Sequence, residues 1–294
     1  MPLYLALTCV SALLAVSVYA IVYRRNSDVS RNVYRLCIAL CATIFLTAVM
    51  PRGADVLSTT LPFGLPWIGT HFRIDVLSAF FLAVVNLGGA AASAYAIGYG
   101  AHEKEPMRVL PFYPAFLAGM NVVVLAGDAF SFLVAWEFMS LASWALVLTH
   151  HHEAENRRAG FVYLLMASFG GFALLMAFGV LGGVGGAYDF ASIRESTKEG
   201  WKTALVLALA LVGMGSKAGL APLHIWLPLA HPAAPSHVSA LMSGVMTKVA
   251  IYGFIRVVFD LLGPPAFWWS IEPLSFGAAS ALIGVLFATI QSDL

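Results

Sequence analysis

The sequence predicts an all-α membrane protein, a polytopic bundle of about nine transmembrane helices in which the seventh is discontinuous. Of the 294 residues, 60% are hydrophobic and only 11% are charged, and the mean hydropathy is +0.85. Soluble domains carry about 25% charged residues. Most of the chain falls into apolar runs of about 20 residues, the length that spans a bilayer as a helix. Glycines and prolines interrupt one run near residues 215–222, and proline breaks a helix.

The first four spans are separated by polar or irregular loops. A basic loop with Arg24 and Arg25 follows the first span, a loop rich in proline and glycine follows the second, and a polar segment precedes the fourth. The first span has no basic leader and no small-residue cleavage site, so we expect it to remain as a span. The four spans are expected at about residues 3–23, 32–50, 74–99 and 109–125.

The later spans carry recognisable helix signals. Asp128 suits the N-cap of the fifth span, glycine and alanine in the sixth allow close helix packing, and Pro235 suits the first turn of the eighth. The seventh is expected to be split, with residues 215–222 non-helical, and residues 189–198 to form a short surface helix. The spans are expected at about residues 129–149, 160–181, 202–228, 235–262 and 274–290.

The basic residues orient this bundle. Lysine and arginine are enriched in cytoplasmic loops. If the loop after the first span is cytoplasmic, that side carries eight basic residues and the other side six. This arrangement places the N-terminus outside, in a multi-pass protein of the cell's inner (plasma) membrane. The net charge of +1 gives no reason to expect nucleic acid as a partner, whereas the lipid bilayer is one.

Three charged residues, Glu137, Lys217 and Lys248, lie deep within apolar runs. A charge at the bilayer centre costs roughly 2.5–3.5 kcal/mol on insertion scales, and such residues usually face protein or water and serve ion movement. The alternative for a lysine is to reach the interface from a helix end, which suits Lys202 or Arg256 better. Pairing Glu137 with Lys217 would offset the cost of both charges. Such a pair could switch the lysine between holding and releasing a proton, or could be a static ion pair.

Histidines and hydroxyls accompany these charges. His224, His231 and His237 lie between the two lysines, and each could carry a proton or merely satisfy a helix end. Ser140 shares a helix face with the glutamate of the fifth span. His237 and Lys248 are eleven residues apart, close to three helical turns, so they are expected to share a face of the eighth span.

Other residue patterns argue against metal and redox chemistry in this chain. Acids and arginines surround the consecutive histidines 150–152, which favours a solvated loop over a metal site. Cys9, Cys37 and Cys41 have neither a metal-ligand spacing nor a disulfide framework. No nucleotide-binding or redox-metal motif is found. We therefore expect no cofactor, no bound metal and no catalytic site in this chain.

Four segments of the chain carry a recognisable pattern: WEFMSLASW, HHHEAENRRAGFVYLLMA, GSKAGLAPLHIWLPLAHPAAPSHVSALMSGVMTKVAIYG and FATIQSDL. They resemble the antiporter-like proton-translocating subunits of complex I, Mrp-type cation/proton antiporters and membrane-bound hydrogenases. The resemblance covers about residues 111–294. The three-histidine loop and PSHVSALMSGVMTK are most similar to hydrogenase-4 component B and the formate hydrogenlyase membrane subunit.

The resemblance implies roles for individual residues. Glu137 matches the glutamate that modulates the proton path, and Lys217 matches the lysine of the broken helix. Lys248 matches the lysine of the connecting path, while His231 and His237 fall in a link lined by polar residues. His224 lies in the same segment.

The resemblance also implies one copy of an inverted structural repeat. Residues 1–108 are expected to form three N-terminal helices, residues 109–262 a proton-translocation unit, and residues 263–294 the start of a truncated second half. Relatives continue past QSDL with a second, inverted copy.

The implied function is a proton- or cation-translocating subunit of a hydrogenase- or complex I-like redox complex. Other membrane subunits and peripheral redox subunits would be its partners. The alternatives are a subunit of a multisubunit cation/proton antiporter and a non-conducting membrane anchor.

Overall fold

The computed structural model describes residues 2–26, 28–50, 56–65, 69–183, 186, 188–196 and 200–290. Over these residues, nine helical stretches are long and apolar enough to cross a membrane, so the nine predicted spans are confirmed. Their bounds are Pro2–Val22, Val29–Val49, Val76–Tyr99, Pro106–Leu125, Ala129–Val147, Ala154–Gly182, Gly200–Ala233, Ser236–Leu261 and Phe267–Thr289.

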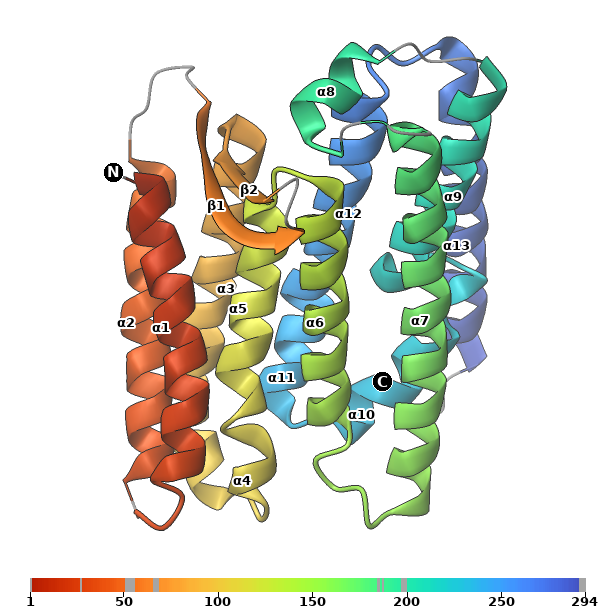
Figure 1. Ribbon diagram of the computed structural model, residues 1–294. Helices are drawn as coiled ribbons and strands as arrows, with labels where there is room; N and C mark the ends of the chain where they lie inside the picture. The colour runs from red at the N-terminus through yellow and green to blue at the C-terminus, as the bar shows by residue number, and fades with distance from the viewer. Residues whose placement is uncertain are drawn as a thin grey trace.

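The long helices run side by side in one bundle (Figure 1). Their contacts close a ring in the order α1, α2, α3, α12, α9, α7, α6, α5 and back to α1. In the span that contains α5, 83% of the apolar stretch is buried, so α5 is the core helix of the bundle. The bounds are α1 (Pro2–Val22), α2 (Val29–Val49), α3 (Val76–Tyr99), α5 (Phe112–Leu125), α6 (Ala129–Val147), α7 (Ala154–Gly182), α9 (Gly200–Ala218) and α12 (Thr247–Ile255).

The two ends of the bundle differ. The short helix α4 (Pro106–Val109) lies at the lower end in Figure 1, together with the loops after α1 and α6. The short helix α8 (Phe190–Glu195) lies at the upper end, which confirms the predicted surface helix over six residues. Lys198 of that prediction, and the QSDL segment, lie outside the described residues. Which end faces the cytoplasm stays a prediction.

An antiparallel hairpin, β1 (Leu57–Leu65) and β2 (Gly69–Ile74), was not predicted in the segment that the sequence indicated as loop. The hairpin lies at the same end as α8 (Figure 1). Residues 51–55 and 66–68 of the predicted loop lie outside the described residues. Asp128 fastens the hairpin to α6, because its carboxylate accepts from the backbone N–H of His71 (2.7 Å) and of Ser131 (2.6 Å). The predicted N-cap role of Asp128 is thereby confirmed.

The predicted break in the seventh span is confirmed, but its bounds are shifted. α9 continues through residues 215–218 and ends at Ala218, because Gly219 adopts the left-handed conformation (φ +83°). Leu220 N–H then donates to Gly215 O at 2.9 Å and closes the helix end. The chain continues through the 3₁₀ turn η2 (Leu223–Trp226) and the helix α10 (Leu227–Ala233). The predicted end at Pro228 is wrong, since this proline lies in the first turn of α10, where proline is tolerated.

The eighth span matches its predicted bounds but is not a regular α-helix. It consists of α11 (Ser236–Leu241), the π-helical segment η3 (Met242–Met246), α12, and a second π-helical segment, η4 (Arg256–Leu261). The ninth span contains η5 (Phe267–Ser270) and α13 (Ile271–Ile290). None of its apolar stretch is buried within the chain, so α13 lies on the outside of the ring.

Candidate functional site

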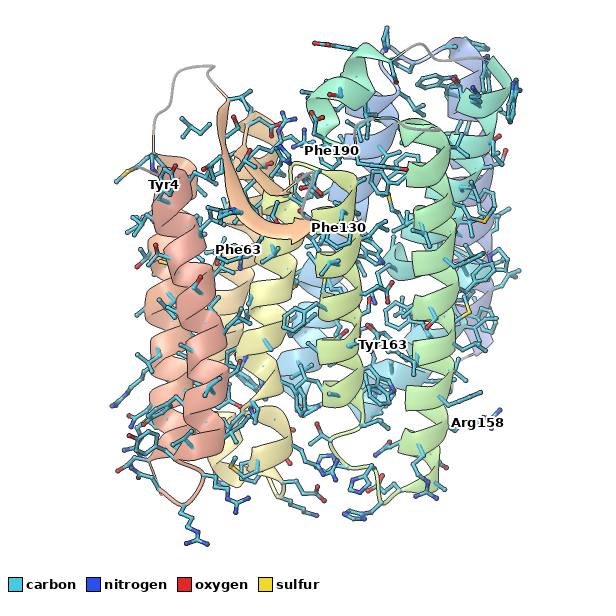
Figure 2. The ribbon with its side chains drawn as sticks, in the orientation of Figure 1. Tyr4, Phe63, Phe130, Arg158, Tyr163 and Phe190 are labelled. Atoms are coloured by element: carbon cyan, nitrogen blue, oxygen red, sulfur yellow. The ribbon has the colours of Figure 1, made fainter. Side chains whose placement is uncertain are left out.

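Lys217 lies in the last turn of α9, immediately before the break, and its side chain is buried (3% exposed). Its ammonium donates to Ser140 Oγ on α6 (2.8 Å) and to Tyr163 OH on α7 (2.9 Å). Nζ also lies 4.8 Å from the centre of the Tyr163 ring. Figure 2 shows Tyr163 between α6 and α7. Two hydroxyl groups from neighbouring helices, rather than a carboxylate, therefore hold this buried lysine.

Glu137 lies one helical turn before Ser140 on α6 and is half-buried. Among the ion pairs of the described residues, none joins Glu137 directly to Lys217, whose described side-chain partners are Ser140 and Tyr163. The glutamate approaches α7 closely at Gly171, where an added Cβ atom would clash with Glu137 Oε1. The two charges therefore make no direct contact among the described residues, and their coupling stays a prediction.

Tyr163 joins the helices around Lys217, and sequence reasoning did not single it out. Its hydroxyl lies 2.6 Å from Ser143 Oγ on α6 and donates to Met246 Sδ, 3.6 Å away, on the π-helical segment η3. The sequence does contain a tyrosine, Tyr163, within an apolar helix, and two serines, Ser140 and Ser143, in the preceding helix. Such a contact depends on how two helices pack.

The broken segment supplies a second wall of this cluster. The indole N–H of Trp226 donates to Ser216 O (2.7 Å), and its ring packs edge-on against Tyr163 with centroids 5.0 Å apart. His231 stacks on Trp226, and its Nδ1 lies 2.9 Å from Ser239 Oγ of α11. The Nε2 atom of His231 is buried and has no hydrogen-bond partner within the described protein. His231 thus lies between the lysine cluster and the eighth span.

The other two predicted histidines lie elsewhere. His237 is buried (1% exposed) and its Nε2 lies 3.2 Å from Tyr34 OH of α2, with the Tyr99 and Tyr113 rings packed around it. His224 packs against Phe287 of α13, with ring centres 6.1 Å apart. The described hydrogen bonds connect neither histidine to the cluster around Lys217.

Lys248 is exposed on the outer surface of α12. Its ammonium donates to Ser243 O (3.1 Å) and Thr247 Oγ1 (3.3 Å) of its own helix. The prediction that His237 and Lys248 share a face is wrong, because His237 is buried. The π-helical segment η3 lies between them, and its i→i+5 bonds turn the helix less per residue than the α-helical pattern assumed.

A second buried charge cluster, at the hairpin end, was not predicted. Arg256, which the sequence suggested would lie at the interface, is only 2% exposed and binds Asp75 with two hydrogen bonds (2.7 and 2.8 Å). It also donates to Asp260 (2.7 Å), which Arg194 of α8 binds in turn, and Arg73 of β2 binds Asp75. Five charges of alternating sign therefore connect β2, α3, the eighth span and α8.

This cluster fixes the ionised state of Asp75, the residue before α3. Burial alone would raise the pKa of Asp75, but the hydrogen bonds and charge of Arg256 and the backbone N–H of Ser78 hold it well below its usual range. The sequence signals were the spacings Arg-x-Asp and Arg-x₃-Asp. Neither spacing indicates that the two pairs meet across the bundle.

Residues 126–294, more than half of the chain, match the family described as NADH:quinone oxidoreductase/Mrp antiporter, transmembrane region. The chain belongs to this family. The matched region of this antiporter-like subunit contains Glu137, Lys217 and Lys248, together with the break in the seventh span.

Relatives and solved structures agree with this assignment. An uncharacterised protein of Mycobacterium tuberculosis (strain H37Rv) is 45% identical over 233 residues, covering 78% of this chain and 36% of that protein. Hydrogenase-4 component B of Escherichia coli (strain K12) is 41% identical over 226 residues, covering 76% and 34%. The chain thus spans about a third of the length of these curated relatives.

The fold of this antiporter-like subunit is similar to a chain of the Mrp complex from Dietzia sp. DQ12-45-1b. The TM-score is 0.74 at 25% identity, covering 89% of this chain and 49% of that one. The predicted resemblance to antiporter-like membrane subunits is therefore confirmed, and the chain is a multi-pass membrane protein.

Proposed function

We propose that this chain translocates protons as a subunit of a hydrogenase- or complex I-like complex in the inner (plasma) membrane, and that Lys217 holds and releases the proton. The observation that carries this proposal is the pair of hydroxyls around Nζ. A hydroxyl both donates and accepts hydrogen bonds. Tyr163 OH can accept from the ammonium and can donate to the neutral amine, so both states of the buried lysine can have partners.

Glu137 would set how readily Lys217 gives up its proton. Glu137 lies one turn before Ser140 on α6, and Ser140 binds Lys217 Nζ, so small movements of α6 relative to α9 would change the distance between the two charges and their attraction. A static ion pair would instead require direct contact between the two charged groups. The lack of such a contact among the described residues supports the modulating role.

The onward route that the contacts support runs from the cluster to the eighth span. His231 Nδ1 lies near Ser239 Oγ, the Ser239 carbonyl accepts from Ser243 Oγ (3.1 Å), and the Ser243 carbonyl accepts from Lys248 Nζ. We propose that these polar groups, with water between them, lead protons toward Lys248. The roles of His224 and His237 stay predictions.

The same proposal includes the three units predicted from the sequence, residues 1–108, 109–262 and 263–294. Lys248 is exposed on a membrane helix, and a charge facing lipid is costly. α13 is likewise uncovered. Both observations support further protein packed against these surfaces, such as the second half of the family's repeat or another membrane subunit, with peripheral redox subunits completing the complex.

The second candidate is a subunit of a multisubunit cation/proton antiporter, with no redox partner. The fold similarity to the Mrp complex favours it. The two candidates differ in what drives the proton: electron transfer in the first, and a counter-moving cation in the second.

The experiment replaces Lys217 in the assembled complex, reconstituted in vesicles with a pH-sensitive dye. Lys217→Ala is expected to abolish proton movement while the yield of intact complex is retained. Lys217→Arg is expected not to restore it, because arginine stays protonated at working pH. Lys202→Arg, at the other end of the same helix, is the matched control and should pump normally. Normal pumping by Lys217→Arg would refute the proposal.

A further inference from the structure

Two loops at the lower end of the bundle bring acids and histidines together in register. Glu103 pairs with His150 (2.9 Å), and Glu105 pairs with His152 (3.4 Å). The two acids are two residues apart in the chain, and so are the two histidines. The segment before α4 and the loop between α6 and α7 therefore run side by side. The histidine loop is therefore folded against acidic partners and is not simply solvated.

Three side chains of these two segments converge on one point. One ligand atom each from Glu105, His151 and His152 lies within 4.8 Å of the others. Imidazole nitrogen and carboxylate oxygen are ligands of zinc, at about 2.0–2.2 Å in a tetrahedral arrangement, which places ligand atoms about 3.4 Å apart. The distance between Glu105 Oε1 and His152 Nε2 already has this value, 3.4 Å.

The imidazole of His151 has a ligand atom to offer. Its Nδ1 is buried without a hydrogen-bond partner in the described protein, and its Nε2 lies 3.2 Å from Arg108 Nη2. Arginine only donates, so Nε2 accepts from it and the ring hydrogen is on Nδ1, which makes Nε2 the atom that a metal would take once Arg108 moved away.

Arg108 lies where it would compete with a metal ion. Its Nε is 3.1 Å from Glu105 Oε2 while its Nη2 contacts His151, so one guanidinium bridges two of the three converging groups. A cation in this place neutralises Glu105 when no metal is bound. A metal ion with higher charge and shorter ligand distances could replace it if the arginine side chain, which is 46% exposed, turned into solvent.

We propose that Glu105, His151 and His152 bind a divalent transition metal of the zinc type, and that Arg108 occupies the site in its absence. Water would supply the fourth position of a three-ligand tetrahedral site. The bound ion would fasten the segment before α4 to the loop that joins α6 and α7.

The test uses the full chain in detergent micelles or nanodiscs, with any histidine tag removed. Zn²⁺ binding is measured by titration calorimetry, and Co²⁺ is added as a probe whose visible absorption reports tetrahedral coordination. His151→Ala and His152→Ala are each expected to weaken Zn²⁺ binding at least about 10-fold. The unfolding temperature of each metal-free variant shows that it is folded.

Two further variants make the test specific. Arg108→Gln is expected to tighten Zn²⁺ binding by about 5-fold or more, because it removes a unit charge beside the ion. His150→Ala is the matched control and should leave the affinity unchanged, because His150 pairs with Glu103 outside the three ligands. The proposal would be overturned if the wild type, His151→Ala and His152→Ala bound Zn²⁺ with equal affinity. It would also be overturned if neither the wild type nor Arg108→Gln bound Zn²⁺.

Discussion

Replacing Tyr163 by Phe tests whether the hydroxyls around Lys217 matter for proton transport. The change removes the oxygen that lies 2.9 Å from Nζ and keeps the ring that packs on Trp226. A hydrogen bond to a charged group contributes about 1.5–3 kcal/mol. Since about 1.4 kcal/mol corresponds to a factor of ten in rate, transport by the variant should slow by roughly 10- to 100-fold if Lys217 has the proposed role.

The assay is proton transport by reconstituted complex as a function of pH. If Lys217 carries the proton as proposed, transport should be slower in Tyr163→Phe than in the wild type across the pH range, because the ammonium has lost one of its two hydroxyl partners. Ser140→Ala should slow transport in the same way, because Ser140 accepts from the other Nζ–H. Tyr95→Phe, at an exposed tyrosine of α3, should leave the profile unchanged. Wild-type transport in both Tyr163→Phe and Ser140→Ala would refute this account of the site.

Two other perturbations test the surroundings. Gly171→Ala places a methyl group where the Glu137 carboxylate lies, so transport should slow with little loss of assembled complex; Gly179→Ala, on the same helix with nothing within 4 Å, should be neutral. Arg256→Met removes one partner of a buried ion pair, a change that costs about 3–5 kcal/mol, and should lower the unfolding temperature. Adding Asp75→Asn to Arg256→Met should recover part of that loss, and strictly additive losses would show that the pair is not coupled.

The pH dependence of unfolding follows from the lowered pKa of Asp75. A carboxyl group with a lowered folded-state pKa contributes stability that is present above its unfolded value, here 3.8, and is lost as the pH falls through the folded value. The unfolding temperature of the wild type should therefore fall below about pH 4, and Asp75→Asn should show a smaller fall over that range. Equal falls in the two proteins would contradict this.

The spans could be predicted from the sequence because each is a local property. Hydropathy over about 20 residues, the cap at Asp128 and the glycines near residue 219 act within one or two helical turns. The hairpin could not be predicted in the same way, since β1 and β2 pair with each other and are held by Asp128, which lies more than fifty residues further along the chain.

The site was predictable only in part for the same reason. Lys217 was identifiable because a lysine in an apolar run has few explanations. Its partners were not, because Tyr163 and Ser140 meet Nζ only after three helices have packed. The buried position of Arg256 likewise depends on Asp75, 181 residues away, so a rule about helix ends placed it wrongly at the interface.

The π-helical segment η3 gives the eighth span an adjustable register. A π turn contains one residue more than the α-helix holds over the same turn, and one residue of an α-helix corresponds to about 100° of rotation. The i→i+5 backbone hydrogen bonds of this segment, rather than the side chains around Lys248, thus decide on which side of the protein Lys248 lies. Deleting a single residue within 242–246 would restore a regular helix and turn Lys248 by about 100° relative to His237.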